Sequence, residues 1–266
     1  MAFIPAHSLV QASGATPKKT AFILHGILGH QRNWRSFAKS LSTAHPHWAF
    51  VLIDIRNHGR SQGSEGPHTV QTSAQDLVNL ANHIGKPDAI IGHSYGGKVS
   101  LFFSALMSLE QCWILDSIPH PQSTQAQQDL RHIFEQLRNA GAPFKSREDM
   151  VEQLQAKGLT AGLIQWMTTN LKRSDAGYDW AFHLDNATDM IEDYFEWDAM
   201  PILEGTAHPI HLVRAADNSQ WTEDIIDDIQ SCAPLVQLHT LENAGHWVHV
   251  DNPTGLQHLM KPYFKA

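Results

Sequence analysis

The sequence is poor in cysteine, in positive charge and in long apolar runs, and each shortage excludes a class of protein. Its 266 residues include two cysteines, Cys112 and Cys232, which are too few for a disulfide framework and indicate a reducing compartment. The 27 acidic residues outnumber the 19 basic ones, so nucleic acids and anionic membranes are not expected partners. No apolar run approaches the roughly 18 residues that a membrane-spanning helix needs.

The first residues also lack the features of a targeting signal. MAFIPAHSLVQASG has neither a basic segment followed by a long apolar stretch nor an arginine-rich amphipathic pattern. We therefore expect a cytoplasmic protein. Its length suits one α/β domain that carries an insertion.

Short apolar runs recur along the chain and alternate with segments of helical period. The runs cover residues 21–24, 48–54, 88–92, 112–116, 210–213 and 236–241. Between them, apolar side chains recur at i, i+3, i+4 and i+7: Trp34, Phe37, Ala38 and Leu41, then Leu77, Leu80, Ala81 and Ile84. We expect the second helix to begin at Thr72 or Ser73 and to end at Gly85. Runs that are apolar throughout predict an α/β fold with a doubly wound, mostly parallel sheet.

The alternation stops between residues 117 and 205, where no strand is predicted. Helical stripes fill this region: Leu130, Ile133, Phe134 and Leu137 form one, and Met150, Val151 and Leu154 form another behind Ser146. A third, less regular segment covers residues 160–171. We therefore predict an inserted helical cap over residues 117–205, and a core made of residues 1–116 and 206–266.

The stretch GHSYG places Ser94 between a predicted strand and a predicted helix. A residue on so tight a turn has a strained backbone, and Gly92 and Gly96 allow the flanking segments to pass each other. A serine there becomes a nucleophile if a base takes its proton and donors hold the oxyanion. The amide of Tyr95, at the start of the helix, is one such donor.

A histidine is the expected base, and position selects among the 18 in the chain. His246, in NAGHWVH, follows the last strand-like run and takes the final place in the order nucleophile, acid, histidine. His249 lies in the segment that starts the last helix, and His93 is expected to point away from its neighbour Ser94. His246 and His249 match a metal site only weakly, so no metal is predicted.

The acid that orients the histidine has two candidates in the sequence. Asp217 follows the predicted strand IHLVRAA, and Asp116 follows CWIL. In a parallel sheet both strand ends face the same edge as Ser94. The spacing leaves both aspartates open.

Two further loops are expected near the nucleophile. HGILG, residues 25–29, follows a predicted strand, and its glycines let the amide of Ile27 turn toward Ser94 as a second oxyanion donor. DIRNHGRS, residues 54–61, follows the next strand. Its Asp54, Arg56 and His58 predict a polar network that holds this loop.

Together, HGILG, DIRNHGRS, GHSYGGK, ILDSIP, ADNSQW and NAGHWVH resemble the α/β-hydrolase superfamily. Within it, the chain is similar to small bacterial carboxylesterases and to mitochondrial α/β-hydrolase-domain proteins that share DxRNHGxS. The resemblance runs from about residue 20 to the end. It implies an α/β-hydrolase fold with a helical cap, no cofactor, and hydrolysis of ester or thioester substrates. The family nucleophile falls on Ser94, the base on His246, and the oxyanion donors on the amides of Ile27 and Tyr95.

The resemblance also bears on the acid. In this subgroup the carboxylate belongs to a DxxP-like stretch after the strand that follows the nucleophile helix, and DSIP places Asp116 there. The later loop of such proteins reads GxNS without an acid, whereas AADNS supplies Asp217 here. Asp116 is favoured, and Asp217 stays an alternative.

The predicted function is that of a serine carboxylesterase acting on small esters with short to medium acyl chains. A thioesterase, lyase or perhydrolase on the same scaffold, or a catalytically silent binding protein, is the alternative. The cap aromatics indicate an apolar substrate site, although most are expected to pack in the cap's own core: Phe134, Trp166, Trp180, Phe182 and Trp197.

Overall fold

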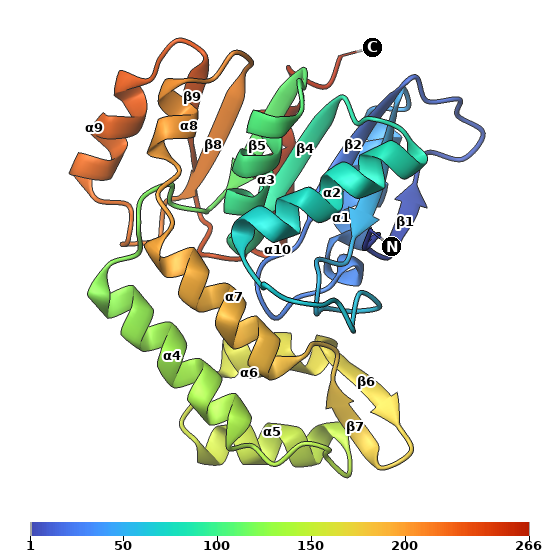
Figure 1. Cartoon of the computed structure of the whole chain (residues 1–266), viewed down its shortest axis with the longest axis vertical. Helices are drawn as coiled ribbons and strands as arrows, with labels where there is room; N and C mark the ends of the chain where they lie inside the picture. The colour runs from blue at the N-terminus through green and yellow to red at the C-terminus, as the bar shows by residue number, and fades with distance from the viewer. Residues whose placement is uncertain (1, 266) are drawn as a thin grey trace.

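A single large sheet forms the centre of the protein, with helices on both faces and a further group of elements below it in Figure 1. The computed structural model describes residues 2–265. Over these residues the large sheet has seven strands, in the order β1-β3-β2-β4-β5-β8-β9. Their bounds are β1 His7–Val10, β2 Lys19–Leu24, β3 Trp48–Ile53, β4 Ala89–His93, β5 Gln111–Leu115, β8 Ile210–Ala215 and β9 Val236–Leu241.

The strands pair in parallel, except that β1 pairs antiparallel with β3. Strands β3, β4 and β5 are buried along their whole length, which explains why their sequences are apolar without alternation. The predicted doubly wound, mostly parallel sheet is confirmed. The apolar runs do not predict β1, because this edge strand is only partly buried.

Helices cover the two faces of the sheet and pack into two buried clusters. Helices α1 (Arg35–Ala44) and α11 (Pro253–Met260) lie on one face, and α2 (Val70–Ile84) and α3 (Tyr95–Leu106) lie on the other. The predicted stripes are buried, including Leu41 on α1 and Leu77 on α2, except for Ile84, which is exposed at the end of α2. The other elements around the sheet are the 3-10 helix η1 (Gln31–Trp34), α9 (Glu223–Ser231) and α10 (Val248–Asp251).

Helix α2 begins earlier than the sequence predicts. Its N-cap is Thr69, whose Oγ1 accepts a hydrogen bond from the amide of Thr72 at 3.1 Å, so the expected start at Thr72 or Ser73 is wrong. Thr69 has the extended backbone that an N-cap requires, and the sequence cannot show which of several hydroxyl residues adopts it. The predicted end at Gly85 is confirmed.

The chain between β5 and β8 builds the group of elements below the sheet, except for its last helix, α8, which lies beside the sheet near β8 (Figure 1). The helices are α4 Thr124–Arg138, α5 Arg147–Ala156, α6 Ala161–Thr169, α7 Leu184–Glu196 and α8 Met200–Glu204. Ser146 caps α5 as expected, and its side chain accepts a hydrogen bond from the amide of Asp149. The predicted stripes lie on α4 and α5. We call residues 117–205 the cap segment, and its separation from the core as a domain stays a prediction.

The cap segment is not entirely helical. Strands β6 (Leu171–Ser174) and β7 (Gly177–Trp180) form an antiparallel hairpin, so the expectation of no strand in this region is wrong. The two strands are short and mostly exposed or half-buried, and they lack the apolar runs that mark the strands of the large sheet. Within residues 2–265, no helix combines the length and the apolar character needed to cross a bilayer.

Lys98, on α3, forms hydrogen bonds to the parts of the cap segment that lie near both of its ends. Its side chain is fully buried, and Nζ donates hydrogen bonds to the carbonyl oxygens of His120, Tyr194 and Trp197 at 2.8, 3.0 and 2.5 Å. His120 lies between β5 and α4, and the other two acceptors lie at the end of α7. Helix carbonyls at that end lack intrahelical partners and favour a cation.

Replacing Lys98 by methionine should therefore destabilise the fold. Lys98→Met leaves three buried carbonyls without their donor, and we expect the free energy of unfolding to fall by about 2–4 kcal/mol. Urea denaturation at neutral pH measures the change. The control is Lys86→Met at an exposed position, with an expected change within about 0.5 kcal/mol. Equal stability of the two variants would contradict the role given to Lys98.

Candidate active site

Ser94 stands on a sharp turn between β4 and α3. Its backbone has φ 53° and ψ −121°, and residues other than glycine rarely adopt such a positive φ. The amide of Ser94 donates to the carbonyl of Leu115 on β5 at 3.0 Å, which holds the turn against the sheet. The side chain is half-buried and lines a cavity.

The glycines around Ser94 are required by close packing. A Cβ at Gly92 would lie 2.1 Å from the carbonyl oxygen of Gly96, and a Cβ at Gly96 would lie 2.5 Å from that of His25. Both distances are shorter than any real Cβ contact. The flanking strand and helix can therefore cross at this turn only if both positions lack a side chain.

The loop after β2 lies directly beside the turn. A Cβ on Gly26 would be 3.1 Å from the Cβ of Ser94, so this loop and the serine are in close approach. Ile27 lines the same cavity as Ser94. Within residues 2–265, the amides of Ile27 and Tyr95 donate to no protein acceptor, so both are available to a ligand.

His246 and Asp116 are joined by a hydrogen bond. Nδ1 of His246 lies 2.7 Å from Oδ2 of Asp116, although the two residues are 130 positions apart in the chain. Asp116 follows β5, and His246 lies on the loop after β9. Both residues line the cavity with Ser94. Because Nδ1 contacts the carboxylate, Nε2 on the opposite side of the ring remains available to another group.

The Asp116 carboxylate is buried and held by three further donors. Oδ1 accepts from the amide of Ala215 at 3.0 Å and from Nε1 of Trp221 at 2.7 Å, and Oδ2 also accepts from Nδ2 of Asn218 at 2.8 Å. With this many donors around it, the carboxylate cannot rotate freely. Asn218 and Trp221 belong to ADNSQW, in which the sequence pattern gives a role to Asp217 and none to these two residues.

The structure does not bring Asp217 to His246. The side chain of Asp217 is exposed, and the residue does not belong to the cavity lining. The backbone amide of Asp217 donates to the carbonyl oxygen of Ala244 at 3.1 Å. This bond holds the backbone of the loop and does not involve the carboxylate. Of the two candidate acids, only Asp116 contacts the histidine.

Two other histidines, His93 and His249, lie beside His246. Nε2 of His93 lies 2.6 Å from the backbone carbonyl oxygen of His246, so His93 donates to the loop that carries it. His249 stacks on Trp34 with ring centroids 3.9 Å apart. Burial lowers the pKa of His93 well below its ordinary value and that of His249 to about 3, so both rings are neutral. Sequence reasoning did not identify His93 as a support of this loop, because its contact is with the backbone.

A reciprocal pair of histidines joins the loops HGILG and DIRNHGRS. Nε2 of His25 accepts from the amide of Ile55 at 3.0 Å, and Nε2 of His58 accepts from the amide of Leu28 at 3.0 Å. Each ring donates through Nδ1 to a backbone carbonyl: His25 to Gly26 and His58 to Arg56. Burial lowers the pKa of His25 to about 3 and that of His58 to about 4, so the acceptor nitrogens stay unprotonated.

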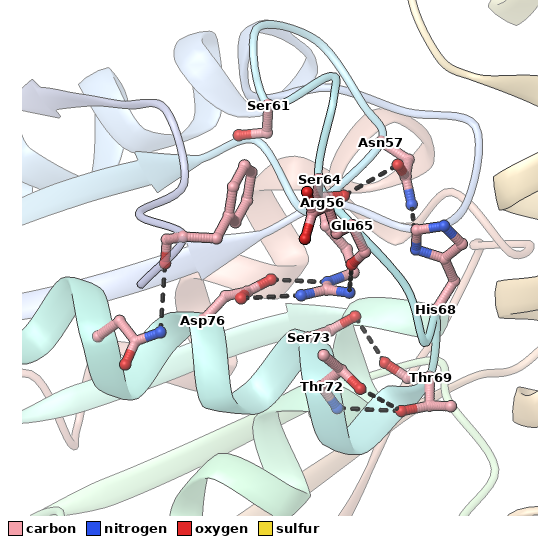
Figure 2. A network of polar contacts seen from close by, with 12 residues as sticks. Arg56, Asn57, Ser61, Ser64, Glu65, His68, Thr69, Thr72, Ser73 and Asp76 are labelled. Atoms are coloured by element: carbon pink, nitrogen blue, oxygen red, sulfur yellow. Dashed lines mark hydrogen bonds and ion pairs between the residues drawn. The ribbon is translucent and has the colours of Figure 1, made fainter. Parts of the chain in front are cut away.

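The polar network predicted for DIRNHGRS is confirmed, and Figure 2 shows its buried ion pair. Arg56 binds Asp76 of α2 through two hydrogen bonds of 2.7 and 2.9 Å, and it also donates to the carbonyl of Pro67 at 2.7 Å. Asp54 accepts from the amides of Gln31 and Arg60. Together with the two histidines, these contacts fix the backbone that carries the amide of Ile27.

The cavity above Ser94 has a volume of about 530 Å³ and a largely apolar wall. Much of this wall comes from the cap segment: Ile118, Ala126, Leu130, Ile133, Leu159, Leu163, Trp166 and Ile191. Of the cap aromatics, Trp166 lines the cavity, whereas Phe134, Trp180 and Phe182 are buried in the core as expected. No cluster of three or more His, Cys, Asp or Glu side chains suited to a metal occurs among residues 2–265.

The chain is similar in sequence to known proteins. The model of the family described as "Alpha/beta hydrolase family" matches residues 21–256. The "sn-1-specific diacylglycerol lipase ABHD11" of Danio rerio is 28% identical over 244 residues, which cover 86% of this chain and 73% of that protein. The "Esterase YbfF" of Escherichia coli K12 is 24% identical over 245 residues, 91% of each chain.

A solved structure is similar over almost the whole chain. The structure titled "Marine microorganism esterase" superposes with a TM-score of 0.85 and 24% sequence identity, covering 98% of this chain and 99% of that one. At this identity the likeness shows the fold, which is the α/β-hydrolase fold.

Because His58 is neutral when folded, acid should destabilise the protein. Between the ordinary pKa of about 6.5 and the folded value of about 4, the unfolded chain binds a proton that the folded chain does not, so stability falls as pH falls. From pH 7.5 to 5.0, His58 alone contributes a loss of about 2 kcal/mol.

His58→Gln tests this assignment, since the amide oxygen can accept from Leu28 without titrating. Urea denaturation at pH 7.5 and 5.0 should show an acid-induced loss that is smaller by about 2 kcal/mol in the variant than in the wild type. The control His47→Gln, at an exposed position, should keep the wild-type loss. An unchanged loss in His58→Gln would contradict the assignment, because it would show that the ring has the same pKa in the folded and unfolded states.

Proposed function

The chain belongs to the alpha/beta hydrolase family, and from this premise we propose that it is a serine carboxylesterase for short to medium acyl esters. The observation that carries the proposal is the 2.7 Å hydrogen bond between His246 and Asp116 in the cavity that Ser94 also lines. Nucleophile, base and acid come in the chain order typical of this fold. The relatives described above, an esterase and a lipase by name, support the same class of reaction.

In the proposed mechanism, Ser94 attacks the ester carbonyl while Nε2 of His246 takes its proton. The resulting oxyanion accepts hydrogen bonds from the amides of Ile27 and Tyr95. His246 then gives the proton to the leaving alcohol, and the acyl group stays on Ser94. A water molecule, deprotonated by His246, attacks the acyl-enzyme and releases the carboxylic acid and the free serine.

Asp116 is the proposed acid of this triad. Its hydrogen bond to Nδ1 selects the tautomer of the neutral ring in which Nε2 can accept the proton of Ser94, and it stabilises the imidazolium that forms during the reaction. Ala215, Asn218 and Trp221 hold the carboxylate in the position that this role needs. Asp217, which is exposed, has no part in the proposed mechanism.

The cavity supports the proposed range of substrates. Its volume of about 530 Å³ lies within the usual range for small-molecule sites, and its apolar cap residues suit a hydrocarbon chain. The acyl group is proposed to lie against Leu130, Ile133 and Leu163. The reaction consumes only the ester and water.

We also propose that the protein works in a reducing compartment such as the cytoplasm. Both cysteines are free: Cys112 is buried in β5, and Cys232 follows α9. Burial raises the pKa of the Cys112 thiol, which makes it unreactive.

Removal of the Ser94 hydroxyl should abolish nearly all turnover. We expect Ser94→Ala to lower kcat on 4-nitrophenyl butyrate by about a thousandfold or more, because the acyl-enzyme cannot form. The matched control is Ser104→Ala, at a buried serine of α3 that does not line the cavity. A fluorophosphonate probe should label the wild type and the control but not Ser94→Ala. Wild-type turnover by Ser94→Ala would refute the mechanism.

The two aspartates can be separated by the same assay. Asp116→Asn should lower kcat by about a thousandfold to ten-thousandfold, because the amide favours the wrong tautomer of His246. Asp217→Asn, which carries the same change of charge at an exposed position, should stay within about twofold of the wild type. A larger loss in Asp217→Asn would assign the acid to the later loop.

A further inference from the structure

A second hollow, which we call the basic groove, adjoins the cavity above Ser94, which we call the catalytic cavity. It has a volume of about 1340 Å³ and lies where η1 and the loop after β3 meet α5, α6 and the hairpin β6–β7. Asn33, Trp166, Trp247 and His249 line both hollows. The rings of Trp166 and Trp247, 5.8 Å apart, form part of the wall between them. A molecule in the groove is therefore next to the catalytic cavity.

Cationic side chains are concentrated in this groove. Six of the 19 basic residues line it: Arg32, Arg35, Arg60, Arg147, Lys172 and Arg173. They are exposed, and they come from both the core and the cap segment. The rest of the chain more than balances them, since the whole chain, these six residues included, has a net charge of −8. So strong a local excess of positive charge on an acidic protein indicates an anionic ligand.

Of the six basic side chains, Arg60 lies near a carboxylate, with its Nε 4.0 Å from Oδ2 of Asp54, and the other five pair with no carboxylate among the residues that the structure describes. Among residues 2–265, Arg32, Arg35 and Arg173 take part in no ion pair. Arg147 and Lys172 donate to neutral oxygens. The two carboxylates in the lining are already engaged: Asp54 accepts from backbone amides and from the side chain of Gln31, and Asp251 accepts from the amide of Gly245.

We propose that the basic groove binds an anionic group, a phosphate or a carboxylate, carried by the alcohol part of the substrate. The catalytic cavity is too apolar to take an unpaired charge, so the acyl chain lies there and the charged end lies outside it. Arginines predominate in the groove, and their planar guanidinium groups bind phosphate and carboxylate through paired hydrogen bonds. This inference rests on the proposed esterase function and specifies its substrates as anionic esters.

Three esters of equal chain length test the preference: 3-hydroxypropyl butyrate, its phosphate monoester, and 3-carboxypropyl butyrate. We expect kcat/KM for an anionic ester to exceed that for the neutral one by about tenfold at low salt, and the advantage to shrink toward unity in 0.5 M NaCl because exposed charges are screened. The phosphate and carboxylate arms identify which anion the groove prefers. Equal kcat/KM for the three esters at low salt would overturn the proposal.

Paired variants locate the effect in the groove. The double variant Arg32→Gln/Arg173→Gln removes one charge from the core side and one from the cap side of the groove. The control Lys39→Gln/Lys86→Gln removes two exposed charges elsewhere. The anionic-to-neutral ratio of kcat/KM should fall about tenfold in the groove variant and stay unchanged in the control. Equal ratios in the two variants would contradict the assignment.

A binding measurement separates this inference from the esterase mechanism. Calorimetry with the Ser94→Ala protein and 3-hydroxypropyl phosphate should detect binding that the groove variant weakens about tenfold, whether or not the protein hydrolyses esters. Binding without turnover of any ester by the wild type would refute the esterase and retain the groove. Turnover of esters without any binding of the phosphate would refute the groove and retain the esterase.

Discussion

The hydrogen bond between Asp116 and His246 is the interaction on which the rest of the site depends. It joins the ends of β5 and β9, two strands that are separated in the sheet by β8. The loop after β8 supplies Asn218 and Trp221, which fill the remaining acceptor positions of the carboxylate. Three successive strands of the sheet thus act together to hold one ring, and the buried charge of Asp116 is compensated by four donors.

Strained backbone conformations occur at the carboxyl edge of the sheet, where the loops of the site begin. Among residues 2–265, the non-glycine residues with left-handed φ all follow strands of the large sheet at this edge: Leu28, Asn57, Ser94, Asp116 and Asn243. Each such residue costs about 1–3 kcal/mol unless its surroundings hold it in place. Here hydrogen bonds supply that support: His58 binds the amide of Leu28, and Leu115 accepts from Ser94. Neutral, buried histidines are suited to this work because they accept and donate without carrying charge.

Charge and apolar surface are separated around the site. The cavity over Ser94 is walled by aliphatic side chains of the cap segment, while the adjoining groove collects nearly a third of the basic residues. An acidic protein with one basic groove attracts anions to that groove and repels them elsewhere. Trp166 and Trp247 line both hollows and stand at the boundary between them. The cap segment contributes to both hollows, so its attachment through Lys98 matters for both.

The sequence alone was enough to predict the parallel strands of the large sheet, the family resemblance and the turn that carries Ser94. Strands buried on both faces must be apolar throughout, and a nucleophile turn must have glycines on both sides, so these features are local and visible in the chain. The resemblance to the α/β-hydrolase superfamily is confirmed by the family match over residues 21–256.

Only the tertiary structure decided which partners meet. Asp116 and Asp217 both end strands at the same edge, and the direction of each loop, which depends on distant packing, brings Asp116 alone to His246. The hairpin β6–β7 and the start of α2 at Thr69 likewise depend on context that short sequence patterns do not carry. The basic groove draws its charges from segments up to 141 positions apart, between Arg32 and Arg173, so no local pattern could reveal it.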